Sequence, residues 1–395
     1  MQADKNTSIF LKSYDRSKWE TVKLGDIVEI ISGGTPKTDT VAYWDGDIPW
    51  CTPTDITSNS NKYIHRTERN ITEKGLANSA ARLLPKNTLL LCSRATIGAV
   101  KIAGQSMCTN QGFKNLVCKE KISHEFLFYY IPKLKAQMLS QASGSTFLEI
   151  SKAKLANIEL EIPCDIEEQN FIANTLAAID NHINNLESKI SKYENIKKST
   201  INLLLKPKAD WIKKTIGDVC SFFTSSSKSA YIDPDGQYFI VDMGAVSDDG
   251  TLIAQKRTNY AHDFLHKNDL IMPKDDIGGG NIIGKAVAIQ ENDKYILSDH
   301  VYKLQTELDA TFLSYLINSP KINKYMRAMA TGSAQLGISK RTVSKCELCF
   351  PADLGQQKAI AQKLGAIDEH INNLKQQLKK QRNLKQGLMQ YFFGD

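Results

Sequence analysis

Residues 169–186 read QNFIANTLAAIDNHINNL, and residues 357–374 read QKAIAQKLGAIDEHINNL. Twelve of these eighteen positions are identical at a constant offset of 188 residues. Isoleucine or leucine recurs in both stretches at intervals of three and four residues, a spacing typical of a helix whose apolar seam pairs with another helix. The pattern predicts a chain that is built twice on one plan, with a long helix in each copy.

The repeat extends beyond these helices to the start and end of each copy. Trp19…Leu24-Gly-Asp-Ile resembles Trp211…Ile216-Gly-Asp-Val, and residues 142–163 share several identities with residues 330–351. Between these anchors the two copies differ strongly. We interpret this contrast as one scaffold that carries two different specificity surfaces. The alternative is an old duplication whose middle parts drifted without selection.

Four segments follow from the repeat. Residues 1–162 and 208–351 contain short β-like runs, such as 88–92 and 238–242, and helical stretches at 123–139 and 308–329. Residues 163–207 and 352–395 each contain one long helix. The predicted fold class is α+β: two mixed α/β domains separated by two long antiparallel helices that form a coiled coil, with a pseudo-twofold internal repeat.

The long helices have recognisable limits and one apolar seam each. Pro163 and Pro351 precede them, Asp165 and Asp353 are candidate N-caps, and Pro207 follows the first helix. About 40 helical residues span about 60 Å, and a lone helix with one apolar stripe is unstable in water. We therefore expect the seams to pack on each other, through Leu176, Ile179, Ile183, Leu186, Ile190, Leu364, Ile367, Ile371, Leu374 and Leu378. The alternative is that each helix packs on its own domain.

Composition narrows the class of protein. The 395 residues are 42% apolar and 24% charged, a globular balance that excludes a disordered or collagen-like chain. The net charge of +7 permits a polyanionic partner without requiring one. No apolar stretch approaches the ~18–20 residues of a membrane span, and the start, Met1–Asn6, lacks the apolar core of a signal peptide. Eight cysteines without framework spacing indicate reduced thiols and a cytoplasmic location.

Motifs for catalysis are incomplete. Residues 279–285 match the GxxxxGK spacing of a phosphate-binding loop, but Ala286 stands where a magnesium-binding hydroxyl is needed, and a strand-like run follows. The chain has no Pro-Pro dipeptide and therefore no Asn-Pro-Pro-Tyr loop of amino methyltransferases. We expect no catalytic residue in this chain, which favours a recognition protein over an enzyme.

Cysteine and histidine patterns do not predict a metal site. Cys346-Glu-Leu-Cys349 has no second pair of ligands nearby, so two strand cysteines are expected there. His182 and His370 occupy equivalent positions beside the two seams. Polar contacts between the helices are the expected role of both histidines.

The loops of both domains carry side chains suited to DNA. Residues 32–37 form a turn whose exposed backbone N–H groups favour an anion. Arginine, asparagine and glutamine read base edges with two hydrogen bonds, and lysine and arginine contact phosphates. The candidate DNA-binding residues are Ser32, Gly33, Gly34, Thr35, Lys37, Lys62, Arg66, Arg69, Arg82, Ser93, Arg94, Thr96, Asn110, Gln111 and Lys114 in the first domain, and Lys228, Lys256, Arg257, Lys274, Asn281, Lys285, Lys340 and Arg341 in the second. The alternative for any one of them is an ordinary solvated side chain.

Nearly the whole chain resembles the specificity (S) subunits of type I restriction-modification systems. The features that carry the resemblance are Trp19…Leu24-Gly-Asp-Ile, Ser32-Gly-Gly-Thr-Pro, the 93–98 turn, Gly144-Ser-Thr with its counterpart Gly332-Ser-Ala, and the two helices. The second copy departs from this pattern, because Ser225-Ser-Ser-Lys stands where the first copy has Gly-Gly-Thr-Pro.

The resemblance implies two target-recognition domains, each reading one half of a split site in double-stranded DNA. It implies that the paired helices set the spacing and dock two methyltransferase (M) subunits, which supply S-adenosylmethionine for adenine methylation. Restriction (R) subunits would supply ATP- and magnesium-dependent translocation and cleavage, so this chain would need no cofactor and would be non-catalytic.

Three other interpretations stay open at this point. One is an enzyme whose active site is unrecognised, and methylation or cleavage by the purified chain would support it. The second is a coiled-coil scaffold that joins two partners without nucleic acid. The third keeps DNA recognition but places it in a methylation system that lacks a nuclease.

We expect the helix pair to set the distance between the two half-sites in DNA. Inserting a pair of heptads near Tyr193 is expected to lengthen the unread spacer of the methylated motif, because the helix pair would become longer. Sequencing of methylated bases measures the spacer directly. An unchanged motif would count against this role of the helices.

Overall fold

The computed structural model describes residues 16–144, 148–333 and 335–394. Met1–Asn6 and three residues of the repeat, Ser145, Thr146 and Ala334, lie outside the described residues. The chain divides into two compact units: unit 1 comprises residues 1–185 and 379–395, and unit 2 comprises residues 186–378. Among the described helices, none has the length and apolar character that crossing a membrane requires.

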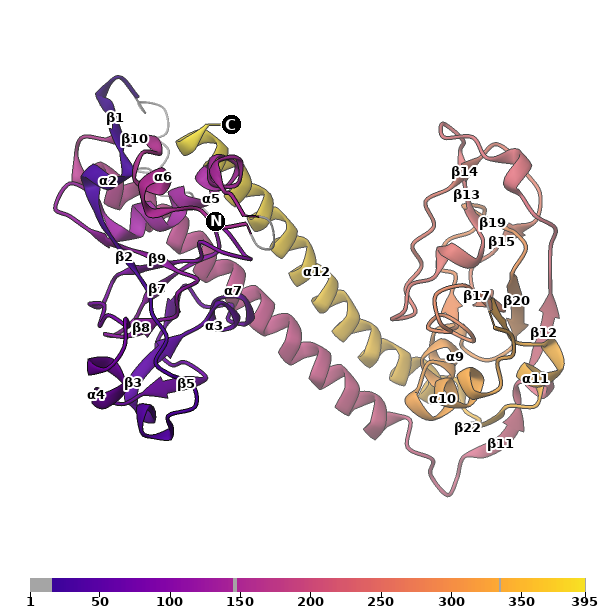
Figure 1. The fold of residues 1–395 in the computed structure, drawn as a ribbon. Helices are drawn as coiled ribbons and strands as arrows, with labels where there is room; N and C mark the ends of the chain where they lie inside the picture. The colour runs from indigo at the N-terminus through magenta and orange to yellow at the C-terminus, as the bar shows by residue number, and fades with distance from the viewer. Residues whose placement is uncertain (1–15, 145–147, 334, 395) are drawn as a thin grey trace. The chain divides into compact units, whose positions relative to one another are not determined.

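Unit 1 is a mixed α/β unit built on short strands (Figure 1). Its strands are β1 (Trp19–Lys23), β2 (Val28–Ser32), β3 (Trp44–Cys51), β4 (Tyr63–Ile64), β5 (Arg69–Ile71), β6 (Leu89–Leu91), β7 (Val100–Ala103), β8 (Cys108–Thr109), β9 (Lys114–Cys118) and β10 (Glu159–Pro163). Its shorter helices are α2 (Leu24–Ile27), α3 (Pro53–Ser58), α4 (Glu73–Ala77), α5 (His124–Gln141) and α6 (Lys152–Ala156).

Among the described residues of unit 1, the strands form three sheets. The largest has the order β2-β9-β6-β7-β4, the second has the order β5-β3-β8, and β1 pairs with β10. Strand β6 lies inside the largest sheet, and its three leucines are fully buried, as expected for a strand covered on both faces. Helix α5 packs Phe126 and Leu127 into the same core as the sheet residue Leu89.

Unit 2 is also a mixed α/β unit of short strands and helices. Its strands are β11 (Ile212–Thr215), β12 (Cys220–Phe223), β13 (Tyr238–Val241), β14 (Arg257–Thr258), β15 (Phe264–Leu265), β16 (Leu270–Pro273), β17 (Asp275–Asp276), β18 (Val287–Ala288), β19 (Tyr295–Leu297), β20 (Val301–Thr306), β21 (Leu336–Gly337) and β22 (Glu347–Phe350). Its shorter helices are α8 (Ile216–Val219), α9 (Ala310–Ile317), α10 (Pro320–Ala328) and α11 (Lys340–Ser344). The stretch 308–329, expected to be helical, divides into two helices because Pro320 begins a new one.

The two units repeat one strand scaffold even where their sequences differ. The order β12-β20-β16-β18 in unit 2 corresponds to β2-β9-β6-β7 in unit 1. Strand β11 pairs antiparallel with β22 as β1 does with β10. The parallel pair β13–β19 corresponds to the parallel pair β3–β8. The prediction of one scaffold used twice is therefore confirmed.

Two long helices, α7 (Ile166–Leu204) and α12 (Leu354–Phe393), belong partly to each unit. The carboxylates of Asp165 and Asp353 accept backbone N–H groups from the first turns of these helices, at 2.9 and 2.8 Å. Both aspartates therefore act as the expected N-caps.

The ends of the helices are part of the domain cores. In unit 1, Ile172 and Leu176 of α7 share a core with Phe392 and Phe393 at the end of α12. In unit 2, Leu205, just beyond α7, shares a core with Ala361 of α12. The start of each helix therefore packs beside the end of the other, which is the antiparallel arrangement.

The middle parts of the seams contact each other within unit 2. Leu186 and Ile190 of α7 pack with Leu374 of α12, and Tyr193 and Leu378 flank them. The other predicted seam residues lie along the same faces: Ile183, Leu364 and Ile371 are buried, and Ile179 and Ile367 are half-buried. Each of the two packing hypotheses thus describes a part of the helices: they pair in the middle and enter domain cores at their ends.

A buried glutamine joins each long helix to its domain. The side chain of Gln169, which is 0% exposed, accepts the N–H of Ser123 at 2.9 Å. Its amide donates to the carbonyls of Lys121 at 3.1 Å and Pro163 at 2.9 Å. Gln357 makes the equivalent pair of hydrogen bonds with Asp309 N–H and Pro351 C=O, both at 2.9 Å. These glutamines explain why the repeat retains this residue at the same position of both helices.

Replacing Gln169 is expected to destabilise unit 1. The substitution Gln169→Leu would leave one N–H and two carbonyls without partners, and each such loss costs about 1–3 kcal/mol. We expect the free energy of unfolding to fall by about 3 kcal/mol or more in a urea titration. The control is Gln386→Leu, at an exposed position of α12 in the same unit, which should change stability by no more than about 0.5 kcal/mol. Equal effects of the two substitutions would contradict the bridging role.

Candidate nucleic-acid interface

Three of the turns selected from the sequence meet at one edge of the largest sheet in unit 1. Strand β2 ends at Ser32, which pairs with Lys114 at the start of β9. Cys92, directly after β6, forms a bridge with Phe113. The turns 32–37, 93–98 and 110–114 therefore leave the sheet side by side, although they are far apart in the sequence.

The first of these turns is held against the third by close backbone contact. Gly34 N–H donates to the carbonyl of Thr109 at 2.9 Å. A Cβ atom at position 33 would lie 1.9 Å from the carbonyl oxygen of Asn110, so only glycine fits there. The hydroxyl of Thr35 donates to the side-chain carbonyl of Gln111. Thr35 and Gln111 thus present neighbouring polar groups, and the side chain of Gln111 is exposed.

Two buried tryptophans donate hydrogen bonds to backbone carbonyls of the 32–37 turn. The indole N–H of Trp50 donates to the carbonyl of Gly34 at 2.9 Å, and that of Trp44 donates to the carbonyl of Lys37 at 3.1 Å. The two rings meet edge to face with centroids 5.0 Å apart. The guanidinium of Arg69 lies 3.6 Å from the centroid of the Trp44 ring, a cation–π contact that orients an exposed positive charge beside the turn.

The second and third turns contain both internal and exposed candidates. Ser93 is buried and its hydroxyl donates to the carbonyl of Gly112 at 3.1 Å. Lys114 is also buried and forms an ion pair of 3.0 Å with Glu149. Arg94 is half-buried and pairs through its backbone with Glu149, whereas Thr96 is exposed. Ser93 and Lys114 therefore stabilise the turns, and Thr96 lies on their surface.

The remaining basic candidates of unit 1 differ in surroundings. Lys62 binds the carboxylate of Glu125, and the rings of Tyr63, Phe128 and Tyr129 lie 5.1–5.6 Å from its ammonium group. Burial alone would raise the pKa of Glu125, but hydrogen bonds from Lys62 and Tyr63 lower it. Lys62 thus has a structural partner. Arg66 and Arg82 are exposed.

The corresponding edge of unit 2 also gathers three turns. These turns follow β12, follow β16 and precede β20, the strands equivalent to β2, β6 and β9. The N–H of Lys228 donates to the hydroxyl of Ser298 at 3.1 Å. The imidazole of His300 contacts the carboxylate of Asp275 at 2.7 Å.

Lys228 is not a surface group, contrary to its use as a DNA-contact candidate. Its side chain is 1% exposed, and its ammonium group contacts Asp263 at 2.7 Å and Ser225 at 2.9 Å. Hydrogen bonds from Lys228 and Ser225 lower the pKa of Asp263, so this carboxylate stays charged and offsets the buried ammonium. The lysine therefore holds the turn that replaces Gly-Gly-Thr-Pro.

Other basic candidates of unit 2 are engaged or surface-exposed. Lys256 pairs with Asp242 at 2.5 Å, and Arg257 donates to the carbonyl of Gly236 at 3.2 Å. Burial lowers the pKa of Lys285, and the neighbouring positive charge of Arg327 lowers it further. Lys274 is half-buried, and the exposed members are Asn281, Lys340 and Arg341.

Sequence reasoning missed the acidic partners of this edge. Asp242, Asp263, Asp275 and Asp299 accompany the bases, and His300 lies between two of them, 2.7 Å from Asp275 and 3.3 Å from Asp299. The only sequence signal for Asp299 and His300 was their position. Residues 298–300 directly precede β20, as residues 111–113 directly precede β9 in unit 1. Trp44 and Trp50 were missed because apolar residues in a strand look like ordinary core.

Within the described ranges, no group of three or more His, Cys, Asp and Glu side chains could hold a metal ion. Burial raises the pKa of Cys346 to about 11, so this thiol is neutral at pH 7. The loop 278–284 is folded by Asp276, which accepts the N–H of Gly278 at 2.5 Å, and strand β18 follows it.

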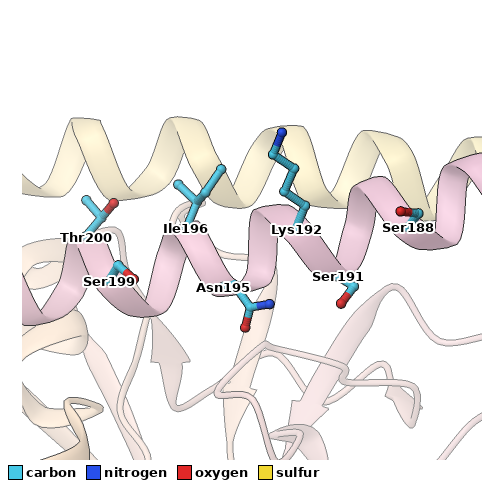
Figure 2. Close-up of a pocket in the computed structure, with 7 residues that line it drawn as sticks. All are labelled: Ser188, Ser191, Lys192, Asn195, Ile196, Ser199 and Thr200. Atoms are coloured by element: carbon cyan, nitrogen blue, oxygen red, sulfur yellow. The ribbon is translucent and has the colours of Figure 1, made fainter.

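A second exposed surface lies on α7 in unit 2. Figure 2 shows seven side chains that project from this one helix and line a pocket: Ser188, Ser191, Lys192, Asn195, Ile196, Ser199 and Thr200. Small hydroxyl and amide groups dominate, and Ile196 is 39% exposed. His370 of α12 makes a ring contact with Tyr193 of α7, 4.3 Å between centroids, which places this histidine between the helices, while the polar contacts expected of His182 and His370 stay a prediction.

Comparison with known proteins agrees with this architecture. The chain is 42% identical over 180 residues to the MjaIX specificity subunit of Methanocaldococcus jannaschii, a match that covers 45% of this chain and 41% of that protein. It therefore spans only about two-fifths of that relative. The MjaVIII specificity subunit of the same organism is 23% identical over 94% of this chain and 91% of its own length.

Solved structures of low identity share the fold. The type I restriction-modification S subunit from M. genitalium superposes with a TM-score of 0.68 at 14% identity, covering 95% of this chain and 96% of that one. The model of the type I restriction modification DNA specificity domain matches this chain twice, over residues 16–194 and 208–382. Because these two matches take in most of the chain and coincide with its two structural repeats, the chain belongs to the family of type I restriction modification DNA specificity domains.

Proposed function

We propose that this chain is the non-catalytic DNA-specificity subunit of a type I restriction-modification complex. The observation that carries the proposal is the presence of two unlike polar edges on one repeated strand scaffold. Reading two different DNA sequences requires two different sets of loops. A repeated scaffold can carry them, because strand pairing uses the backbone and leaves the turns free to vary.

The two edges differ in chemistry. In unit 1, hydroxyl and amide groups such as Thr35 and Gln111 lie beside the cation of Arg69. In unit 2, the exposed Lys256 pairs with Asp242, and the buried Lys228 holds the partly exposed carboxylate of Asp263. A glutamine favours adenine and a carboxylate accepts from the amino group of cytosine. The proposed target is therefore an asymmetric site in double-stranded DNA with two half-sites and an unread spacer.

The complex would require partners for its chemistry. Two M subunits would bind S-adenosylmethionine, R subunits would bind ATP and magnesium, and this chain would bind none of these. The exposed polar face of α7 is the proposed docking surface for an M subunit, supported by its small side chains and by Ile196. A cytoplasmic location follows from these partners and from the eight cysteines.

The decisive test is single-molecule sequencing of methylated bases in DNA from cells with and without this gene. We expect a split adenine-methylation motif that is present only with the gene. The assembled complex should also bind DNA with an affinity that falls steeply as salt rises. Absence of both effects would favour the coiled-coil scaffold interpretation instead.

Gln111 provides a test of the edge in unit 1. The substitution Gln111→Ala should weaken base preference in one half of the motif only, by the loss of about 1–3 kcal/mol of discrimination. The control Gln137→Ala changes an exposed glutamine of α5 in the same unit and should leave the motif intact. The readout is the frequency of each base in methylated sites. A motif that Gln111→Ala leaves unaltered would remove this residue from the interface.

A further inference from the structure

Each long helix carries one aspartate that contacts a tyrosine and a lysine at the same time. In unit 1, Asp180 of α7 accepts a hydrogen bond from the hydroxyl of Tyr129 at 2.9 Å. The same carboxylate forms an ion pair with Lys385 of α12 at 2.6 Å. Tyr129 belongs to α5, a helix of the domain core. Three separate helices therefore meet at one carboxylate.

Unit 2 contains the same arrangement. Asp368 of α12 accepts a hydrogen bond from the hydroxyl of Tyr315 at 2.6 Å, and Lys197 of α7 contacts its other oxygen at 2.6 Å. Tyr315 belongs to α9, which occupies the place of α5 in the repeat. We call these two groups the Tyr–Asp–Lys triads.

The triads exchange their lysines between the two copies of the repeat. Asp180 and Asp368 are 188 residues apart, and so are Lys197 and Lys385. Lys197 nevertheless pairs with Asp368, and Lys385 pairs with Asp180. Each aspartate thus holds the tyrosine of its own copy and the lysine of the other copy, so one carboxylate links a domain to both long helices.

The surroundings make these contacts strong. The aspartate side chains are 28–29% exposed and the lysines 27–32%, so solvent screens them less than a fully exposed pair. Each ammonium group also lies 5.7–5.9 Å from the centroid of the triad's tyrosine ring. Burial, together with the neighbouring carboxylate, raises the pKa of Tyr129 and of Tyr315 well above the usual range, so both hydroxyls remain donors at neutral pH.

We infer that the Tyr–Asp–Lys triads are positioning elements that fix the orientation of each recognition domain on the helix pair. Apolar packing alone tolerates small rotations, because dispersion contacts have no preferred direction. A charge-assisted hydrogen bond at 2.6–2.9 Å is directional and adds that missing constraint.

This inference rests on the proposed function for its consequence in DNA recognition. One base pair occupies about 3.4 Å along the duplex, so a displacement of a few ångströms at a recognition edge changes which spacer length fits. A domain without its triad should still read the same bases, but it should accept more than one spacer length.

The physical coupling can be tested on the full chain without DNA. Tyr129→Phe and Lys385→Met each remove one partner of Asp180 while retaining the bulk of the side chain. Each should lower the midpoint of thermal unfolding by about 2–4 °C. The shift of this midpoint in the double variant should differ clearly from the sum of the two single shifts, because residues that share a partner are coupled. Strictly additive shifts would overturn the triad as a unit.

The positioning role needs a second readout in the assembled complex. Asp180→Asn and Asp368→Asn are each expected to give methylated sites with the original half-sites and spacers that differ by one base pair, at a tenth or more of the original frequency. The matched control is Glu194→Gln, which removes an interhelical ion pair with Lys375 at 3.3 Å whose two side chains are about half-exposed. It should retain one spacer length.

The possible outcomes separate the inference from the proposed function. If the unchanged chain directs no split motif, the proposed function fails, and the thermal cycle still decides whether the triads are coupled. If the motif is present but the aspartate variants keep a single spacer while losing stability, the triads only stabilise the fold and the positioning role is wrong. Broadened spacing in the control as well would also overturn it.

Discussion

Helix α7 buries its apolar seam in three different surroundings along its length. Ile172 and Leu176 lie in the core of unit 1, Leu186 and Ile190 pack on Leu374 of α12, and Leu205 beyond its end lies in the core of unit 2. Each such side chain contributes roughly 1.5–3 kcal/mol on burial. A 39-residue helix with one apolar stripe needs all of these contacts. Conversely, neither core is complete without residues from both long helices.

Polar groups give this apolar arrangement its specificity. The buried Gln169 and Gln357 join the helices to strand and loop carbonyls, and Asp180 and Asp368 join them to domain tyrosines. Such groups are costly to bury without partners, so they disfavour any register in which their partners are lost. Both copies of the repeat carry these groups, and their hydrogen bonds belong to the fold of each unit.

The repeated scaffold also explains how two unlike surfaces coexist in one chain. In both units these strands pair through backbone hydrogen bonds in the same order, so strand pairing by itself does not fix which side chains the connecting turns carry. Unit 1 uses glycine at position 33 to bring two turns together, whereas unit 2 uses the buried Lys228 with Asp263. Different solutions to turn packing leave different donors and acceptors at the surface.

The sequence by itself determined the duplication, the two long helices with their caps, and the alternation of domain and helix, because these depend on periodicity and on short-range signals. It also located the turns at 32–37, 93–98 and 110–114, which the structure brings together. It did not separate surface bases from internal ones: Ser93, Lys114 and Lys228 are buried, since the groups that satisfy them come from distant parts of the chain. Only the tertiary structure decided that Lys385 pairs with Asp180 and Lys197 with Asp368. A charge on a helix has no partner until the antiparallel register of the two helices is set, and burial of both seams sets that register.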